Sequence, residues 1–218
     1  MGFFALTSGR SPVMQNMVYE RNRGTSIVTY QAQKFLPTSP LGYDSIDLLY
    51  LNNPDWSKIS SDQQNAIVDW VRAGGQLFVW PGIEPVPSDA PLAKIFPGTI
   101  GDVEPLTLNA DVLKQFGLPA RFGTMSQRPI TATAGAQQLG LLKDATAAVT
   151  ARVALGRVTL MPFEASALQF NNTDRFRDFW ADVLKRTLDR DKKFDASNTN
   201  AANAPTVYQQ IQQQEDIN

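Results

Sequence analysis

Polar side chains follow several of the apolar runs in this 218-residue sequence, where an α/β protein would carry out its chemistry. Parallel sheets bind ligands at the carboxyl ends of their strands. The side chains expected at that edge are Ser8, Arg10, Asn52, Asn53, Trp80 and Glu164. Arginine, asparagine and glutamate suit hydrogen bonding to a sugar or a peptide, and tryptophan suits stacking. The competing interpretation is that these are turn residues and a buried tryptophan, which serve only the fold.

Two residue types that carry much of enzyme chemistry are absent, because the sequence has no cysteine and no histidine. Neither a Cys-His pair nor a Ser-His-Asp triad can be built without them. The usual zinc and transition-metal ligands are also missing, so only oxygen-ligand ions such as magnesium or calcium remain possible. Residues 7–11 lack the spacing of a phosphate-binding loop. We therefore expect no catalytic residue of these kinds, no metal site and no cofactor.

Two pairs of carboxylates lie close together in the sequence, Glu84 with Asp89 and Asp102 with Glu104. Glycoside hydrolysis uses a pair of acids, so a carbohydrate-active hydrolase with Glu164 as a participant is an alternative function. Both pairs fall in a proline-rich stretch, however, and nothing in the sequence fixes their geometry.

Composition and charge narrow the class of protein further. Twenty basic and 21 acidic residues give a net charge of -1, and no basic block predicts binding to nucleic acid. No apolar run approaches the roughly 18–20 residues of a membrane-spanning helix. The length suits one α/β domain over residues 1–190, followed by a polar tail or linker rich in Gln and Asn over residues 191–218.

The stretch from Ile46 to Gly82 is expected to organise the fold as a strand-helix-strand unit. Ile46–Leu51 and Leu77–Trp80 are short apolar runs typical of buried strands. Ser60 precedes Gln63 by three residues, which is the spacing of a capping box, and Gly74-Gly75 predicts the end of the helix. Two such strands joined by one helix predict a parallel pair.

Further strands and helices are expected on either side of this unit. Apolar, β-branched runs predict strands at Phe3–Thr7 and Ser26–Tyr30, with a helix from Ser11 to near Gly24 between them. The resulting alternation predicts a doubly wound, mostly parallel sheet that begins in the order 2-1-3-4. Late in the chain, a turn at Gly156-Arg157 predicts an antiparallel hairpin.

An amphipathic helix that begins near Thr173 is expected to close the domain. Its apolar residues recur at intervals of three and four, as they do on the buried face of a helix. These residues are Phe176, Phe179, Trp180, Val183, Leu184, Thr187 and Leu188.

With these motifs in view, the chain resembles the class I glutamine amidotransferase-like superfamily, which has a flavodoxin-like fold. More narrowly, it is similar to degenerate members found as modules in bacterial envelope proteins. The similar segments, over roughly residues 3 to 188, are Leu41-Gly42-Tyr43-Asp44, Gln63-Gln64, Asp69-Trp70-Val71, Gly74-Gly75, Leu77–Gly82, Leu155-Gly156-Arg157-Val158 and Phe179-Trp180.

The resemblance also indicates where this chain departs from catalytic relatives. Their nucleophilic cysteine follows the strand that matches Leu77–Trp80, and this chain has Pro81-Gly82 there. Their histidine follows the last strand, where this chain has Pro162-Phe163-Glu164. Amidotransferase activity is therefore excluded, and only the scaffold carries over.

The expected function is a non-catalytic, amidotransferase-like module that binds a protein partner or a small polar ligand. The resemblance implies a bacterial envelope or membrane-associated setting, with any tether in a neighbouring segment. A purely structural domain without a ligand is a third possibility.

Overall fold

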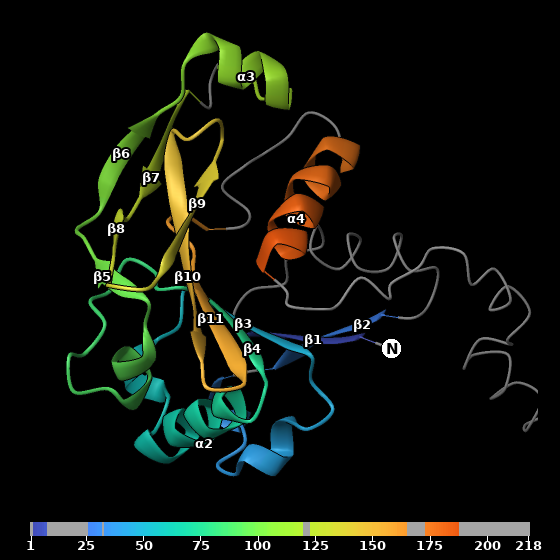
Figure 1. Ribbon diagram of the computed structural model, residues 1–218, viewed down its shortest axis with the longest axis vertical. Helices are drawn as coiled ribbons and strands as arrows, with labels where there is room; N and C mark the ends of the chain where they lie inside the picture. Colours follow the sequence, from blue (N-terminus) through green and yellow to red (C-terminus); the bar gives the residue numbers. More distant parts are fainter. Residues whose placement is uncertain (1, 8–25, 32, 120–122, 165–172, 188–218) are drawn as a thin grey trace, which may run out of the picture. The chain divides into compact units, whose positions relative to one another are not determined.

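A seven-stranded mixed sheet forms the centre of the protein (Figure 1). The computed structural model describes residues 2–7, 26–31, 33–119, 123–164 and 173–187. In spatial order the strands are β2 (Ser26–Gln31), β1 (Gly2–Thr7), β3 (Leu48–Asn52), β4 (Gln76–Trp80), β11 (Gly156–Leu160), β10 (Thr146–Val153) and β9 (Gln137–Leu141). The predicted order of the first four strands is confirmed.

One strand of the sheet, β10, runs opposite to the other six. From β2 across to β11 each strand is parallel to its neighbour, whereas β10 is antiparallel to both β11 and β9. The predicted combination of a mostly parallel sheet with a late antiparallel hairpin is thus confirmed.

Two small sheets and several helices complete the described part of the chain. One small sheet pairs β5 (Gly98–Ile100) with β8 (Ile130–Ala132), and the other pairs β6 (Glu104–Thr107) with β7 (Thr124–Gln127). The α-helices are α2 (Ser61–Arg72), α3 (Ala110–Phe116) and α4 (Thr173–Thr187), and the 3-10 helices are η1 (Gln33–Phe35), η2 (Pro40–Tyr43), η3 (Trp56–Lys58) and η4 (Pro91–Ile95). The helix expected after Ser11 and the tail expected over residues 191–218 lie outside the described residues.

The start of helix α2 is fixed by the capping box that the sequence predicts. The Ser60 hydroxyl accepts a hydrogen bond from the Gln63 backbone N–H at 3.3 Å, and the Gln63 side chain accepts one from the Ser60 N–H at 2.9 Å. Two otherwise unpaired N–H groups at the helix start are satisfied in this way. The Gln63 amide also donates to the Leu36 carbonyl at 2.8 Å, so the same side chain ties α2 to the segment after η1.

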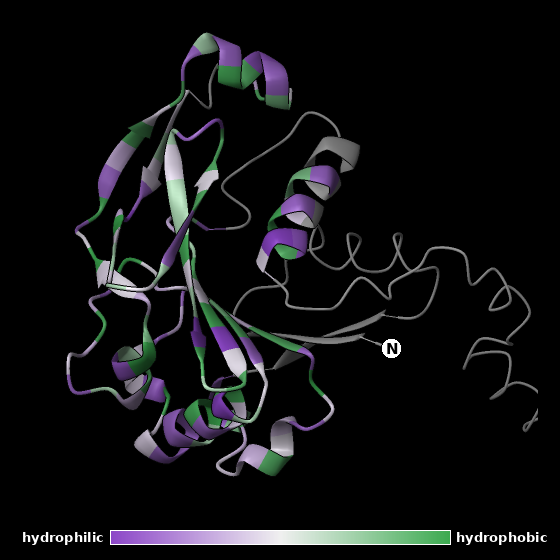
Figure 2. Ribbon diagram, in the orientation of Figure 1, coloured by the Kyte–Doolittle hydropathy of each residue, from purple (hydrophilic) through white to green (hydrophobic). Residues whose placement is uncertain are grey.

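Alternating residues of the central strands pack into two separate apolar clusters, one on each face of the sheet. On β3, Leu48 and Tyr50 belong to one cluster while Leu49 and Leu51 belong to the other. The first cluster contains the buried residues of α4, and the second contains those of α2. Because successive side chains of a strand point to opposite faces, α2 and α4 cover opposite faces of the sheet. Figure 2 shows both helices with mixed green and purple residues, as expected of amphipathic helices.

The hairpin between β10 and β11 turns two residues earlier than predicted. Val153 pairs with Gly156, so the connection is Ala154-Leu155, and Ala154 rather than a glycine takes a positive φ of 54°. The Gly156-Arg157 prediction was wrong because Gly156 is needed for close packing. A Cβ on Gly156 would collide with the carbonyl oxygens of Val71, in the last turn of α2, and of Gly75, just before β4. A glycine in the sequence can mark either a turn or a place of close packing, and the sequence alone does not distinguish the two.

The hairpin also bonds to the residues at and after the end of α2. The Leu155 N–H in the turn donates to the carbonyl of Arg72, the last residue of α2, at 3.2 Å, and the Arg157 N–H of β11 donates to the carbonyl of Gly75, just before β4, at 3.1 Å. The carbonyls of a last helical turn lack partners within the helix, so the hairpin acts as part of the helix cap.

These observations establish an α/β fold with a mixed sheet and few helices in the described residues. The finer prediction of a flavodoxin-like, doubly wound arrangement is not confirmed. No helix within the described ranges is long and apolar enough to cross a membrane.

Tyr43 makes the stability of this fold sensitive to alkaline pH. Its side chain is fully buried, lies 5.7 Å from the Trp70 ring centroid, and donates a hydrogen bond to the Pro37 carbonyl at 3.1 Å. Burial raises the pKa of the Tyr43 hydroxyl well above its usual value. Since the folded-state pKa is the higher one, this contribution to stability is complete below the unfolded pKa of about 10 and is lost as pH rises above it.

The free energy of unfolding of Tyr43→Phe is therefore expected to fall less steeply than that of the wild type as pH increases beyond about 10. At pH 7 it should be less stable by about 1 kcal/mol, because the Pro37 carbonyl loses its donor. Urea denaturation at a series of pH values measures both effects. Parallel stability curves for the two proteins above pH 10 would contradict the assignment.

Candidate functional site

The carboxyl ends of the central parallel strands bring several predicted site residues to one edge of the sheet. Asn52 is the last residue of β3, and its register partner Trp80 is the last residue of β4. Glu164 follows β11, the strand on the other side of β4. Ser8 and Arg10, which follow β1 in the sequence, lie outside the described residues.

Asn52 and Glu164 meet at this edge. The Asn52 amide Nδ2 donates a hydrogen bond to the Glu164 carboxylate Oε1 at 3.4 Å. Asn52 is 9% exposed and Glu164 is half-buried, so the pair lies at the boundary between the interior and solvent. Because β4 lies between β3 and β11, this contact spans the end of the central strand.

Asn53 holds the turn after β3 against the turn after β4. Its backbone takes a left-handed φ of 49°, its N–H donates to the Trp80 carbonyl at 3.0 Å, and its Oδ1 accepts from the Ile83 N–H at 3.4 Å. Gly82 has a φ of 82°, and a Cβ there would collide with the Asn53 Oδ1. Asn53 therefore has the role of a turn residue, which is the competing interpretation of the sequence.

The residues at and after the end of β4 are buried. Trp80 is 5% exposed and packs within the cluster that contains Phe163, so it offers little surface for stacking. Pro81 and Gly82 are also buried, and the Trp56 indole donates to the Pro81 carbonyl at 3.2 Å. Trp80, Pro81 and Gly82 therefore present no exposed side chain at the end of β4.

Arg128 is a contributor to this edge that the sequence analysis did not single out. Its backbone N–H donates to the Pro162 carbonyl at 2.7 Å, beyond the end of β11. Its guanidinium donates from Nε to the Gly101 carbonyl at 2.8 Å, and from Nη1 to the carbonyls of Gly82 at 3.3 Å and Glu84 at 3.1 Å. The side chain thus joins three loops that are distant in the sequence. A single arginine between Gln127 and Pro129 carries no spacing signal that could have revealed this role.

The four carboxylates considered for glycoside hydrolysis show no arrangement of a catalytic acid pair. Glu84, Asp89 and Asp102 are exposed, and the Glu104 carboxylate accepts a hydrogen bond from the Gln127 amide at 3.0 Å. Within the described ranges, no group of three or more Asp, Glu, His or Cys residues is placed to hold a metal ion.

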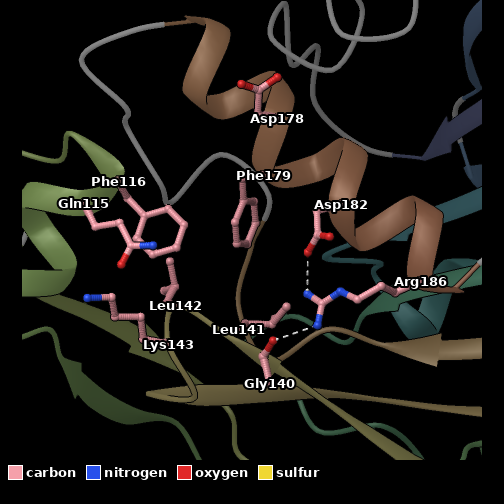
Figure 3. Close-up of a pocket in the computed structure, with 10 residues that line it drawn as sticks. All are labelled: Gln115, Phe116, Gly140, Leu141, Leu142, Lys143, Asp178, Phe179, Asp182 and Arg186. Atoms are coloured by element: carbon pink, nitrogen blue, oxygen red, sulfur yellow. Dashed lines mark hydrogen bonds and ion pairs between the residues drawn. The ribbon is translucent and has the colours of Figure 1, made fainter.

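A groove of about 550 Å³ lies elsewhere, between α3, α4 and the turn after β9 (Figure 3). The rings of Phe116 and Phe179 meet edge to face with centroids 6.1 Å apart. Arg186 lies at one end, where it pairs with Asp182 at 2.9 Å and donates to the Gly140 carbonyl at 3.1 Å.

The apolar residues of this groove belong mainly to the core. Leu141, Leu142 and Phe179 are 1%, 2% and 8% exposed, respectively. The groove therefore presents little apolar surface to a ligand, and we regard the strand-end edge as the stronger candidate site.

Comparison with known proteins identifies solved structures of similar fold, but no family model and no curated protein sequence matches this chain. A cytoplasmic protein of Salmonella typhimurium, STM3548, superposes with a TM-score of 0.60 at 12% identity, over 86% of this chain and 99% of that protein. The GH42 β-galactosidase Gan42B gives a TM-score of 0.51 at 12% identity, over 85% of this chain but only 30% of the enzyme.

The similar structures also include a putative GMP synthase component from Thermoplasma acidophilum. It has 9% identity and a TM-score of 0.44, over 85% of this chain and 97% of that protein, which is too distant to carry an argument. At these identities the superpositions show a shared fold and nothing about activity.

Proposed function

We propose that this chain is a non-catalytic, amidotransferase-like module that binds a small polar ligand or a protein partner at its strand-end edge. The observation that carries the proposal is the closed end of β4. Pro81 and Gly82 are buried there, and their carbonyls accept hydrogen bonds from the Trp56 indole and the Arg128 guanidinium. A turn fixed in this way serves as a structural junction and presents no nucleophile.

The polar groups that remain at the edge are suited to recognition. Glu164 is half-buried, and Asn52 holds its carboxylate in place. A carboxylate accepts hydrogen bonds and an amide both donates and accepts them, so together they suit a ligand with hydroxyl or amide groups. In this proposal Asn52 and Glu164 contact the ligand, Ser8 and Arg10, which follow β1 in the sequence, contribute to binding, and Asn53 and Trp80 support the edge.

The alternative of a carbohydrate-active hydrolase has weaker support. Such an enzyme needs two carboxyl groups roughly 5 to 9.5 Å apart on either side of the scissile bond. Among the described residues the Asn52 amide donates to Glu164, and no observation supports a second acid at that separation from it. The fold shared with Gan42B concerns less than a third of that enzyme. The envelope setting also lacks support, since a protein of similar fold is described as cytoplasmic.

A thermal-shift screen of the purified chain against sugars, amino acids, nucleotides and divalent ions tests the binding function. We expect at least one compound to raise the melting temperature progressively with its concentration, because a ligand that binds only the folded state stabilises it. Asn52→Ala should abolish that shift, and Asn65→Ala, at an exposed position on α2, should leave it unchanged. A ligand response that survives Asn52→Ala would place the binding site elsewhere.

Glu164→Gln separates the binding function from the hydrolase. The amide oxygen of glutamine can still accept from Asn52, so the variant should stay within about 1 kcal/mol of wild-type stability. Assays with nitrophenyl glycosides should show no turnover in either protein. Turnover by the wild type that Glu164→Gln removes, with folding intact, would overturn the non-catalytic assignment.

A further inference from the structure

Arg128 is a buried cation without a counter-ion among the residues that the structure describes. Its side chain is 7% exposed, and no described carboxylate, including that of Glu164, lies within ion-pair distance of it. The three acceptors of its guanidinium are the backbone carbonyls of Gly82, Glu84 and Gly101. These carbonyl dipoles orient the group but leave its positive charge unneutralised.

Burial of a charge is unfavourable unless a charge of opposite sign compensates it. A guanidinium has five N–H groups in one plane. The hydrogen bonds to the three carbonyls use Nε and Nη1. The described hydrogen bonds leave Nη2 without an acceptor, and Nη2 is not among the fully enclosed side-chain atoms that lack a partner, so it is not sealed off from solvent. A positively charged group held by three carbonyls, with one amino group that no described residue engages, suits an oxyanion, which accepts from a guanidinium in a fixed geometry.

The position of Arg128 connects this donor to the candidate site. The residue is bound to the Gly82 carbonyl just after β4 and to the Pro162 carbonyl just after β11, two positions before Glu164. We propose that Arg128 is the anion-recognition group of the strand-end edge, and that the ligand bound there carries an oxyanion, either a carboxylate or a phosphate. This inference rests on the proposed binding function and adds the chemical class of the ligand.

Titration of the full chain with sodium acetate and, separately, with sodium phosphate tests the proposal, with sodium chloride at equal ionic strength as the reference. We expect one or both oxyanions to raise the melting temperature with concentration in the logarithmic form of binding to the folded state, a rise that chloride does not reproduce. Arg128→Gln should raise the dissociation constant fitted from that rise by about 10- to 100-fold, the loss expected for a charged hydrogen bond. Lys143→Gln removes an exposed cation at the groove between α3 and α4 and should change nothing.

The two oxyanions distinguish the possible ligands. A response to acetate alone indicates a carboxylate ligand, and a response to phosphate alone indicates a phosphate ester. A response that is the same in Arg128→Gln and in the wild type is a general salt effect, or an adventitious ion only, and overturns the inference.

A second measurement avoids the substitution, because Arg128→Gln also removes bonds between three loops. In the wild type labelled with ¹⁵N-arginine, the side-chain signal of Arg128 should shift with oxyanion concentration and saturate, with the dissociation constant that the thermal response gives. If no arginine side-chain signal shifts, the inference fails. A different outcome separates the inference from the proposed function. If neither oxyanion changes the melting temperature, but a neutral ligand raises it and Asn52→Ala abolishes that rise, the inference is overturned and the proposed function stands.

Discussion

Replacement of Trp180 by alanine is expected to lower the free energy of unfolding by about 3–5 kcal/mol, the range for large aromatic residues in a well-packed core. Trp180 is 2% exposed and lies in the apolar cluster beneath α4. Its ring meets that of Phe179 edge to face at 5.2 Å, and Phe179 in turn stacks on Phe163 at 6.5 Å. Loss of the indole therefore removes buried area and disturbs an aromatic chain that attaches α4 to the sheet.

Urea denaturation followed by far-UV circular dichroism measures this effect. The matched control is Lys185→Ala, an exposed residue of the same helix, which should change stability by no more than about 0.5 kcal/mol. Equal stability of Trp180→Ala and Lys185→Ala would contradict the packing of α4 on this face.

Gly156→Ala is expected to destabilise the fold by about 3 kcal/mol, as an overpacked core position does. The added methyl group collides with backbone carbonyls of Val71 and Gly75, which cannot rotate away as a side chain would. At a permissive position the same substitution stabilises a protein by about 0.4–1 kcal/mol, because it restricts the unfolded chain. The sign of the change therefore reports directly on the contact between the hairpin and α2.

Gly135→Ala is the reference for this experiment. Gly135 has a left-handed φ of 82° and no neighbour within 4 Å of the added carbon. Its substitution should lower the free energy of unfolding by only about 1–2 kcal/mol, the cost of a left-handed backbone for a residue with a Cβ. Thermal or urea unfolding measures the stability lost to the steric collision in Gly156→Ala and the stability lost to the left-handed backbone in Gly135→Ala. A Gly156→Ala protein more stable than Gly135→Ala would show that the hairpin does not approach the helix so closely.

The central part of the fold is predictable because its signals are local. The capping box at Ser60 and the buried runs of β3 and β4 each occupy a few consecutive residues, and the parallel sheet order follows from them. The small sheets were harder to predict, because their strands have three or four residues and β6 contains Pro105. In a two-stranded sheet the missing N–H of a proline can lie on the side that has no neighbouring strand, so no hydrogen bond is lost. Proline content is therefore a poor sign that a strand is absent there.

The candidate site was predictable only as a location. Sequence reasoning placed Asn52 and Glu164 at the same edge, and the structure brings them within hydrogen-bond distance. It could not distinguish Asn52 from Asn53, because their different roles depend on the left-handed backbone of Asn53 and its contact with Ile83. Arg128 was missed because its partners lie 27 to 46 residues away in the sequence.

The pairing of β4 with β11 has a consequence for how the chain reaches its native state. In these adjacent strands Gln76 pairs with Arg157, although a long middle part of the sequence separates the two residues. At a synthesis rate of about 5–20 residues per second, β4 waits roughly 4–16 s for its partner to leave the ribosome. During that interval an apolar strand edge is open to pairing with other chains. Such distant contacts also slow folding. We therefore expect refolding yield to fall as protein concentration rises, even for a sequence whose native state is stable.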